Sequence, residues 1–314
     1  MPADSDVQFI KRLGRPSLAA LRRDTRKLKT RRFVDKLGQG YLAAGAPPLV
    51  VFAHDYIGNE ININGGYELA ELETAFDWLA PYAAAFRVGA ALDIGANIGN
   101  HTAFFAPRFG RVLSFEPNPR TFGVLSLNAE LFGNVTCFNY GLSDAAAAAA
   151  MTLDRANVGG ARVSGQSETG EVSIALRRLD DALDPDVDVK LVKIDVEGHE
   201  ARALAGAERT LRRHKPIVLF EQHEYDFRDG ASEVVDLLKS FGYRRFAVVR
   251  ERPAQRRALP KILRRPVQSL EKLLFGAERR VVAQHAFAPE FHPFVIAVPD
   301  WVETAPRTAA QTDR

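Results

Sequence analysis

A short glycine-containing segment, Asp93-Ile-Gly-Ala-Asn-Ile-Gly-Asn100, has the residue types of a cofactor-binding loop. Gly95 and Gly99 would let backbone amides approach a ligand that a Cβ atom would exclude. Asn97 tolerates the left-handed backbone of a tight turn. The spacing lacks the middle glycine of a dinucleotide-binding loop, and a leading carboxylate would repel a pyrophosphate. The loop therefore favours a cationic sulfonium cofactor with an amino group over NAD.

Acidic residues recur after the next two apolar segments. Glu116 comes about twenty residues after the loop, where a carboxylate can accept a hydrogen bond from each hydroxyl of a ribose. Ser143 and Asp144 follow a third segment, and Asp144 is a candidate acceptor for an adenine amino group. Since the carboxyl ends of parallel strands meet at one edge of a sheet, these residues are predicted to form one nucleoside site.

Three segments in this order resemble the FkbM-type methyltransferases: 93–102, 115–119 and 193–200. Two further segments, 66–68 and 217–221, fit the same pattern, so the resemblance covers about 50–249 and a closing strand near 294–298. The resemblance implies a class I methyltransferase fold, S-adenosylmethionine as cofactor, and O-methylation of a sugar or natural-product hydroxyl. By that analogy Asp144 lies at the adenine, and Tyr67 and Glu68 line the pocket. The predicted cofactor-binding residues are Glu68, Asp93, Gly95, Asn97, Gly99, Asn100, Glu116, Ser143, Asp144 and Asp195.

Two later segments, 195–200 and 221–224, carry the groups that methyl transfer to a hydroxyl needs. Transfer from a sulfonium is an in-line displacement in which the hydroxyl also loses its proton, so a general base is expected. The candidate bases are His199, Glu221 and His223. Asp195 and Glu197 are expected to shape the pocket, with Glu197 facing the substrate. These carboxylates match no strong metal-binding spacing, and no metal ion is predicted.

The elements that must position these residues alternate along the chain from Leu49 onward. Apolar runs predict strands at 49–52, 90–94, 111–115, 135–140, 151–153, 172–176, 191–194, 217–220, 243–249 and 294–298. Helical spacing is found at 68–79, 120–131, 200–211 and 232–240. Such alternation predicts an α/β fold with a doubly wound sheet. With the resemblance, the expectation is a Rossmann-like sheet of seven mostly parallel strands whose last strand is antiparallel.

Charge divides the chain into parts. Residues 1–48 hold 11 Lys and Arg against 4 Asp and Glu, and 250–280 hold 10 against 3, whereas 49–249 hold 19 against 28. We expect a basic N-terminal extension (1–48), a methyltransferase domain (49–300) with a basic insert (250–290), and a polar tail (301–314). A basic helix starting near Leu18 should end before Pro47.

The partners follow from the same pattern. Within the insert, Leu259–Phe275 mixes apolar and basic residues, as in a segment that either lies on an anionic membrane or caps the domain. One cysteine, no secretory signal and no apolar run of about 18 residues favour a cytoplasmic protein, peripheral to the membrane through its basic flanks. Nucleic acid is not the expected partner because the core is acidic. The acceptor is expected to be a small-molecule, glycan or glycolipid hydroxyl. An NAD-dependent oxidoreductase and a non-catalytic cofactor-binding module remain as alternatives.

Overall fold

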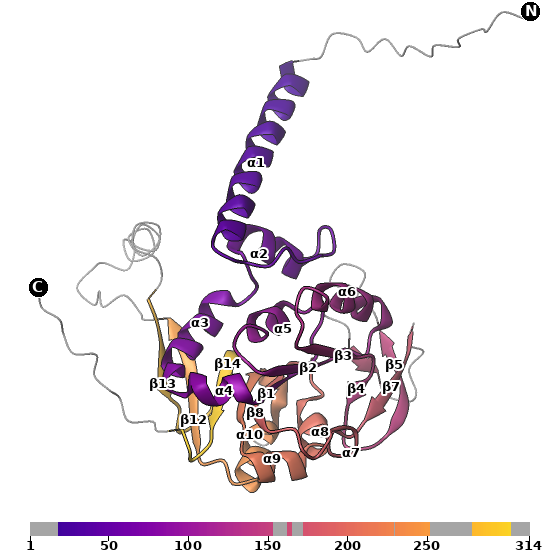
Figure 1. Cartoon of the computed structure of the whole chain (residues 1–314), viewed down its shortest axis with the longest axis vertical. Helices are drawn as coiled ribbons and strands as arrows, with labels where there is room; N and C mark the ends of the chain where they lie inside the picture. The colour runs from indigo at the N-terminus through magenta and orange to yellow at the C-terminus, as the bar shows by residue number, and fades with distance from the viewer. Residues whose placement is uncertain (1–17, 153–161, 165–171, 229, 252–277, 303–314) are drawn as a thin grey trace, which may run out of the picture. The chain divides into compact units, whose positions relative to one another are not determined.

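Residues 18–152, 162–164, 172–228, 230–251 and 278–302 of the 314-residue chain are described by a computed structural model. The chain divides into two units, 1–46 and 47–314. The first unit holds one long helix, α1 (Leu18–Ala43), which confirms the predicted basic helix (Figure 1). Its apolar residues are spread around the axis, and Leu28 and Phe33 are 50% and 61% exposed. This helix therefore lacks the single apolar face of an amphipathic helix.

An eight-stranded mixed sheet forms the centre of the second unit, in the order β13-β12-β14-β9-β8-β1-β2-β3. Its strands are β1 (Ala90–Ile94), β2 (Arg111–Phe115), β3 (Val135–Phe138), β8 (Val189–Ile194), β9 (Ile217–Gln222), β12 (Arg245–Glu251), β13 (Arg279–Ala283) and β14 (His292–Val298). The five strands from β3 to β9 in this order are parallel, and the last strand, β14, is antiparallel to both of its neighbours. The chain runs outward from β1 through β2 and β3, then returns to the other side of β1 at β8. The boundary between β1 and β8 is therefore the topological switch point, where such sheets bind ligands.

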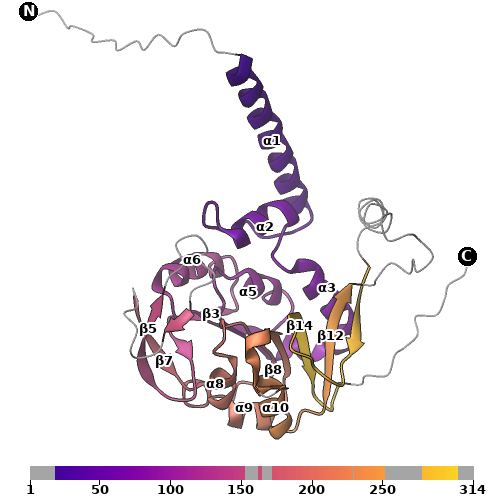
Figure 2. The same cartoon turned by 180° about the vertical axis from the view of Figure 1, so that it is seen from behind.

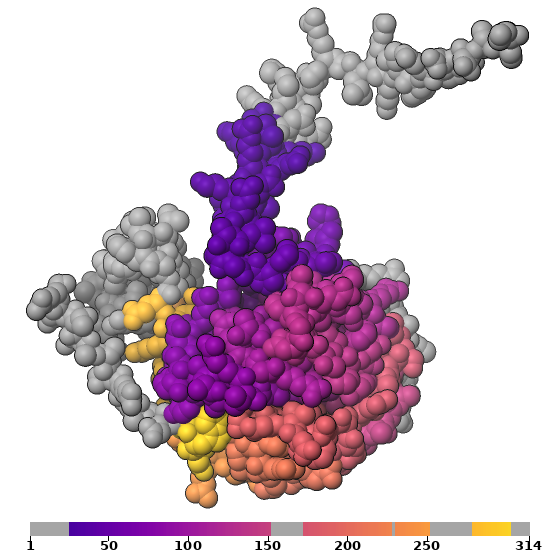
Figure 3. Space-filling view, viewed as in Figure 1, coloured from indigo at the N-terminus to yellow at the C-terminus, as the bar shows by residue number. Residues whose placement is uncertain are grey.

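Helices cover both faces of this sheet (Figures 1 and 2). One face carries α3 (Leu69–Trp78), η1 (Ala80–Tyr82), α4 (Ala83–Val88), α5 (Asn100–Phe105) and α6 (Pro119–Ala129), preceded in the chain by α2 (Tyr56–Asn64). In the space-filling view, purple to magenta residues cover much of the visible side of the second unit (Figure 3). The other face carries α7 (Leu179–Ala182), α8 (Glu200–Ala205), α9 (Glu208–His214) and α10 (Glu233–Ser240). The sheet is thus buried on both sides, as its apolar strands require.

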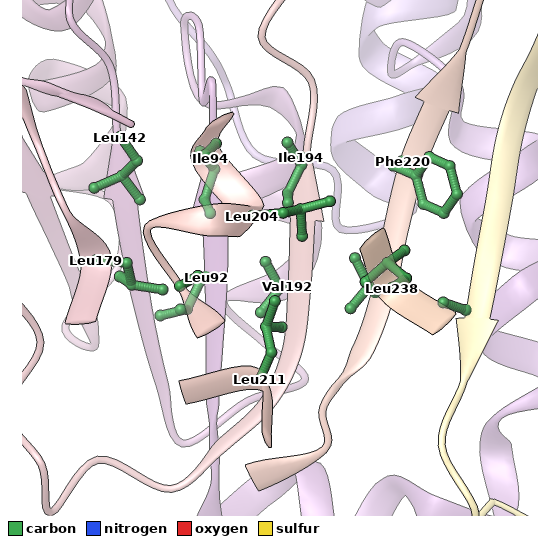
Figure 4. Close-up of a cluster of buried hydrophobic side chains, with 14 of the residues drawn as sticks. Leu92, Ile94, Leu142, Leu179, Val192, Ile194, Leu204, Leu211, Phe220 and Leu238 are labelled. Carbon is green, nitrogen blue, oxygen red and sulfur yellow. The ribbon is translucent and has the colours of Figure 1, made fainter. Parts of the chain in front are cut away.

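The alternation of side chains along the strands divides the core into two layers. In one layer, Leu92, Ile94, Val192 and Ile194 pack against leucines of α8, α9 and α10 (Figure 4). In the other layer, Ala91 and Leu191 pack with Phe105 of α5. Because the period of a strand is two residues, Asp93 and Lys193 belong to this second layer. Two charged residues thus enter the core directly below the carboxyl ends of β1 and β8.

Two smaller sheets are inserted in the chain, one before β8 and one after β9. A four-stranded sheet has the order β4-β7-β5-β6, with β4 (Gly141–Leu142), β5 (Ala147–Thr152), β6 (Arg162–Ser164) and β7 (Val172–Arg177). The strands predicted near 151 and 172 are confirmed as β5 and β7, which share a small apolar cluster of Met151, Ile174 and Leu176. After β9, η3 (Glu224–Asp226) leads to the hairpin of β10 (Phe227–Arg228) and β11 (Ala231–Ser232).

The predicted number of seven strands was wrong. The eighth strand, β13, pairs antiparallel with β12 at the edge of the sheet and lies inside the predicted basic insert. The arginines of β13 interrupt the apolar alternation that predicts a strand. One of them pairs with a helix: Arg279 Nε lies 2.8 Å from Glu71 Oε1 of α3. A charged, partly exposed edge strand is a known way to prevent further pairing of a sheet.

Two other elements differ from the expectation. Residues 49–52 are not a strand, because the side chain of Asn128 takes the backbone bonds that a strand neighbour would make. Its Oδ1 accepts from Val50 N at 2.7 Å, and its Nδ2 donates to Val50 O at 3.0 Å. The helix predicted at 200–211 is interrupted near Gly206, which gives α8 and α9.

The predicted amphipathic segment Leu259–Phe275 lies outside the described residues. Within the described part of the chain, no helix combines the length and apolarity needed to cross a bilayer.

Candidate active site

A pocket lies at the carboxyl ends of β1 and β8, at the switch point of the sheet. Eight of the residues predicted from sequence line it: Tyr67, Gly95, Asn97, Glu116, Asp195, Glu197, His199 and Glu221. It is also lined by apolar residues that sequence patterns did not single out: Ile57, Ile94, Phe115, Leu142, Met151 and Leu176. The pocket therefore has an apolar wall from β2, β4 and the small sheet, and acidic groups from the β8 and β9 ends.

The glycine spacing of the loop after β1 is set by contacts within the chain. Gly95 has φ 75°, and a Cβ atom on it would lie 1.8 Å from the backbone oxygen of Asp195. Gly99 has φ 91°, and a Cβ atom there would lie 2.9 Å from Leu125 Cδ1 of α6. Asn97 takes the left-handed backbone that its residue type allows, with φ 51°. The loop therefore packs against the residue after β8 on one side and against α6 on the other.

Glu116 ties this loop to the end of β2. Its Oε2 accepts from Asn97 N and its Oε1 from Asn118 N, each at 2.9 Å. Burial raises the pKa of Glu116 to about 7, against the opposing effect of these two backbone donors. Glu116, which is predicted to bind a ribose, therefore lines the pocket, and the charge of its carboxyl group changes with pH near neutrality.

Asp93 does not line the pocket. Its side chain is fully buried, and its Oδ2 accepts from Thr102 Oγ1 at 2.6 Å. Thr102 Oγ1 also lies 2.7 Å from Ser114 Oγ of β2. Lys193 Nζ approaches Asp93 Oδ1 to 3.6 Å from the neighbouring strand. The carboxylate of Asp93, which was expected to face the ligand, is therefore part of a buried network beneath the loop.

Lys193 connects that network to the pocket. Its Nζ donates to Gly95 O at 3.1 Å and lies 3.2 Å from Asp195 Oδ2, while its side chain is only 7% exposed. Burial acts to lower the pKa of Lys193, but the charges of Asp195 and Asp93 more than offset it and the net shift is upward. One buried ammonium therefore holds the loop after β1 and the carboxylate after β8 together.

Acidic groups gather on the Asp195 side of the pocket. Glu221 near the end of β9 is half-buried, and desolvation followed by the charges of Asp195 and Glu68 raises its pKa to about 9. Burial and the charges of Glu68 and Glu221 likewise raise the pKa of Tyr67. This side of the pocket is therefore the place where a cationic group of a ligand would be stabilised most.

We expect Glu221→Gln to make the domain more stable above pH 5. The raised pKa of Glu221 means that the folded chain holds a proton which the unfolded chain has released, so this contribution to stability is complete below about pH 4.5 and is lost as the pH rises toward 9. Glutamine is neutral throughout. A gain of about 1 kcal/mol or more, or ~2 °C in Tm, is expected near pH 8.

Thermal unfolding of the two proteins near pH 5 and pH 8 tests this expectation. Glu224→Gln, which changes an exposed carboxylate three residues away, serves as the control with little expected effect. Equal Tm values for Glu221→Gln and the parent chain at both pH values would contradict it.

His199 is held by the residues predicted to lie near adenine. Ser143 Oγ donates to Asp144 Oδ1 at 2.9 Å, and His199 Nε2 lies 2.9 Å from the same hydroxyl. Because a hydroxyl has one hydrogen, His199 Nε2 must donate, which leaves Nδ1 as the bare nitrogen. Burial and the nearby Arg202 lower the pKa of His199, so the neutral imidazole is favoured. The structure groups His199 with Ser143 and Asp144 rather than with Glu221.

The remaining predicted residues support the pocket from outside its lining. Asn100 holds the segment before α3: its Oδ1 accepts from Tyr67 N and its Nδ2 donates to Tyr67 O, each at 2.9 Å. Glu68 Oε2 lies 3.2 Å from His101 Nε2. His223 Nε2 lies 3.2 Å from Glu221 Oε2, and the His223 ring stacks on Tyr225. His223 therefore reaches the pocket indirectly, through its contact with Glu221.

Three residues that shape the site were not selected from sequence. Lys193 and His101 sit inside the recognised motifs, but strand and helix patterns do not indicate which charges they meet. Glu200 accepts from Val196 N at 3.1 Å and Gly198 N at 3.2 Å, which fixes the turn that carries Glu197. A buried charge within an apolar strand was the available signal for Lys193.

Comparison with known proteins points to a methyltransferase family. Residues 93–245 match the model of the methyltransferase FkbM domain. A hexuronic acid methyltransferase, AglP, from Haloferax volcanii is 31% identical over 123 residues, which are 38% of this chain and 50% of that protein. The chain therefore spans half the length of this curated relative.

Solved structures give more distant similarities. A methyltransferase FkbM from Methylobacillus flagellatus has a TM-score of 0.40 and 20% identity, over 52% of this chain and 40% of that one. A putative methyltransferase from Streptococcus mutans in complex with SAH has a TM-score of 0.37 and 13% identity, over 60% of this chain and 93% of that one. The motifs and the family match agree: residues 93–245 of this chain match the FkbM methyltransferase domain.

Proposed function

We propose that the protein transfers a methyl group from S-adenosylmethionine to a hydroxyl of a sugar. The observation that carries this proposal is one pocket that is lined both by the carboxyl group of Glu116 and by the acidic groups Asp195 and Glu221. A nucleoside with a cationic sulfonium fits that combination of an apolar wall, a diol acceptor and negative charge.

In this proposal, different residues of the pocket contact different parts of the cofactor. The apolar wall near Leu142 and Met151 accommodates the adenine, Glu116 accepts from the ribose hydroxyls, and the acidic side stabilises the sulfonium and amino groups. When bound, the cofactor supplies an electrophilic methyl group. Glu221, backed by His223, is the residue placed to take the proton of the acceptor hydroxyl, a role worth roughly 10²–10⁴-fold in rate.

A sugar acceptor is supported by the relative from Haloferax volcanii, whose name is hexuronic acid methyltransferase. We infer a hydroxyl of a uronic acid or of a neutral hexose as the acceptor class. The two acceptors differ in charge, and the acidic side of the pocket favours the neutral one.

The test is transfer of a labelled methyl group from S-adenosylmethionine to oligosaccharides that contain hexuronic acid or only neutral hexoses. The expected product is a methyl ether, which survives mild alkali, whereas a methyl ester on a uronate would be hydrolysed. The parent chain and Glu130→Gln, an exposed site directly after α6, should both form it. Failure of the protein to bind S-adenosylmethionine would overturn the cofactor, and alkali-labile product would overturn the hydroxyl.

A further inference from the structure

Three aromatic rings from two parts of the chain lie side by side near the pocket, and we term them the aromatic row: Tyr225, His223 and Phe291. The His223 and Tyr225 rings are stacked, with centroids 4.6 Å apart and planes 11° apart. The Phe291 ring lies against His223 with a centroid distance of 4.9 Å and an interplanar angle of 36°. His223 is therefore the central ring of the row, and the residue just before β14 completes it.

The aromatic row is continuous with the pocket. His223 Nε2 lies 3.2 Å from Glu221 Oε2, and Glu221 lines the pocket. A Cβ atom on Gly198 would lie 3.5 Å from Tyr225 Cε2, so Tyr225 packs over the turn that follows Glu197, another lining residue. The row therefore begins at the acidic side of the pocket, beside the candidate base.

Exposure to solvent increases along the row with distance from the pocket. The Glu221 and His223 side chains are 18% and 25% exposed, whereas Tyr225 and Phe291 are 49% and 51% exposed. The His223 ring covers one face of Tyr225, so the open surface of Tyr225 lies away from His223. Single exposed apolar residues are ordinary, but two half-exposed rings held on one central ring beside a pocket form a surface that a ligand can cover.

The central ring is held in place through its backbone as well as through Glu221. His223 N donates to Asp226 Oδ2 at 2.6 Å, and Asp226 N donates to His223 O at 3.2 Å. These two bonds cap η3, the short helix that carries Tyr225. Aromatic side chains have few torsions to fix, so they bind a ligand with a small loss of conformational entropy. The row is therefore a preformed surface.

The charges beside the aromatic row are mainly negative. Four carboxylates lie next to its rings in sequence or in space: Glu221, Glu224, Asp226 and Glu290. Arg250 Nη2 lies 3.9 Å from Glu290 Oε1, in an exposed pair that solvent screens. An anionic ligand would be repelled by these carboxylates, so the row favours a neutral one.

A pyranose ring matches both the row and the pocket. The C–H groups on its faces carry a slight positive charge, and the faces of aromatic rings are negative. Its hydroxyl groups lie around the rim, so a ring bound beside Glu221 can direct one hydroxyl toward that carboxyl group. We propose that the aromatic row binds pyranose rings of a neutral saccharide acceptor, which stack against Tyr225 and Phe291. This inference rests on the proposed function and assigns the surface that holds the acceptor.

Binding of oligosaccharides to the full chain tests the proposal. The protein is first saturated with S-adenosylhomocysteine. Maltohexaose, cellohexaose and mannohexaose are the neutral probes, and hexagalacturonate is the charged one. Calorimetry gives the affinity, and NMR saturation transfer reports whether C–H groups of the sugar contact the protein. We expect at least one neutral hexaose to bind, and hexagalacturonate to bind about tenfold more weakly or less.

Two alanine variants then test the rings themselves. Tyr225→Ala and Phe291→Ala should each weaken binding of the neutral hexaose by about threefold to tenfold, the range found for stacked aromatic pairs. Tyr225→Phe keeps the ring and should bind as the parent does. Phe33→Ala removes a 61% exposed ring from α1 and is the control with no expected effect. All four variants should retain the parent affinity for S-adenosylhomocysteine, which also shows that each variant has folded.

The outcomes separate the two proposals. Parent-like affinity for the hexaose in both alanine variants would overturn the aromatic row as the acceptor surface. Failure of all three neutral hexaoses to bind, or tighter binding of hexagalacturonate, would also overturn it, and each of these results would leave the proposed cofactor standing. Absence of S-adenosylhomocysteine binding by the parent chain would instead overturn the proposed function.

Discussion

Replacing Lys193 by methionine is expected to destabilise the second unit by about 3–5 kcal/mol, the cost of removing one partner from a buried ion pair. Lys193 Nζ lies 3.6 Å from Asp93 Oδ1 and 3.2 Å from Asp195 Oδ2, and the Asp93 side chain is fully buried. Methionine fills a similar volume but leaves Asp93 without its opposite charge and Gly95 O without its donor. Urea unfolding followed by circular dichroism should show a lower midpoint.

Lys190→Met is the matched control on the same strand. Lys190 Nζ pairs with Asp188 Oδ2 at 2.9 Å, but the Asp188 side chain is 51% exposed, so a loss below about 1 kcal/mol is expected. Adding Asp93→Asn to Lys193→Met should recover part of the loss, because the unpaired charge is removed. Equal midpoints for the Lys193 and Lys190 variants would show that the buried ammonium does not support this site.

The second large effect concerns Glu116 and the ribose. We expect Glu116→Gln to weaken binding of S-adenosylhomocysteine by about 10²-fold, since two hydrogen bonds to a charged acceptor are each worth about 1.5–3 kcal/mol. The amide also places a donor opposite one of the backbone donors, Asn97 N or Asn118 N, that now meet the carboxylate. Glu130→Gln, at the exposed residue directly after α6, is the control and should bind as the parent does.

The pH dependence gives this prediction a second measure. The pKa of Glu116 is about 7 before binding, and the ribose hydroxyls bind best to the ionised form. Affinity of the parent chain should therefore rise with pH through neutrality and fall below it, where a proton must first be lost. The thioether is the right ligand because it lacks the charge that acts on Glu221. Calorimetry of Glu116→Gln should give a flat profile, and a parent profile that is also flat would refute the assignment of Glu116.

The sequence predicted the parts of the site that depend on local order along the chain. Gly95, Asn97 and Glu116 follow apolar strands, and parallel strands bring their carboxyl ends to one edge, so the pocket could be placed without coordinates. Lys193 could not be assigned in this way. Its partner Asp93 lies opposite it across a strand pair, and that register is set by the whole sheet.

Sequence patterns also could not predict which residues contact the candidate bases. His199 and Glu221 were predicted as alternative bases, yet they have different partners: His199 Nε2 lies 2.9 Å from Ser143 Oγ, while Glu221 Oε2 lies 3.2 Å from His223 Nε2. Which side of the pocket each one serves depends on how the loop at 195–200 turns. That turn is fixed by Glu200, which acts through backbone groups rather than through the ligand.

The closeness of Gly95 to the Asp195 carbonyl bears on how this site would decay in evolution. A side chain at position 95 would collide with the backbone of Asp195, after the neighbouring strand β8, whether or not a cofactor is ever bound. Selection for folding alone would then preserve this glycine. Among descendants of such a chain that had lost methyl transfer, an intact glycine at this position would mark the fold and not the use of the cofactor.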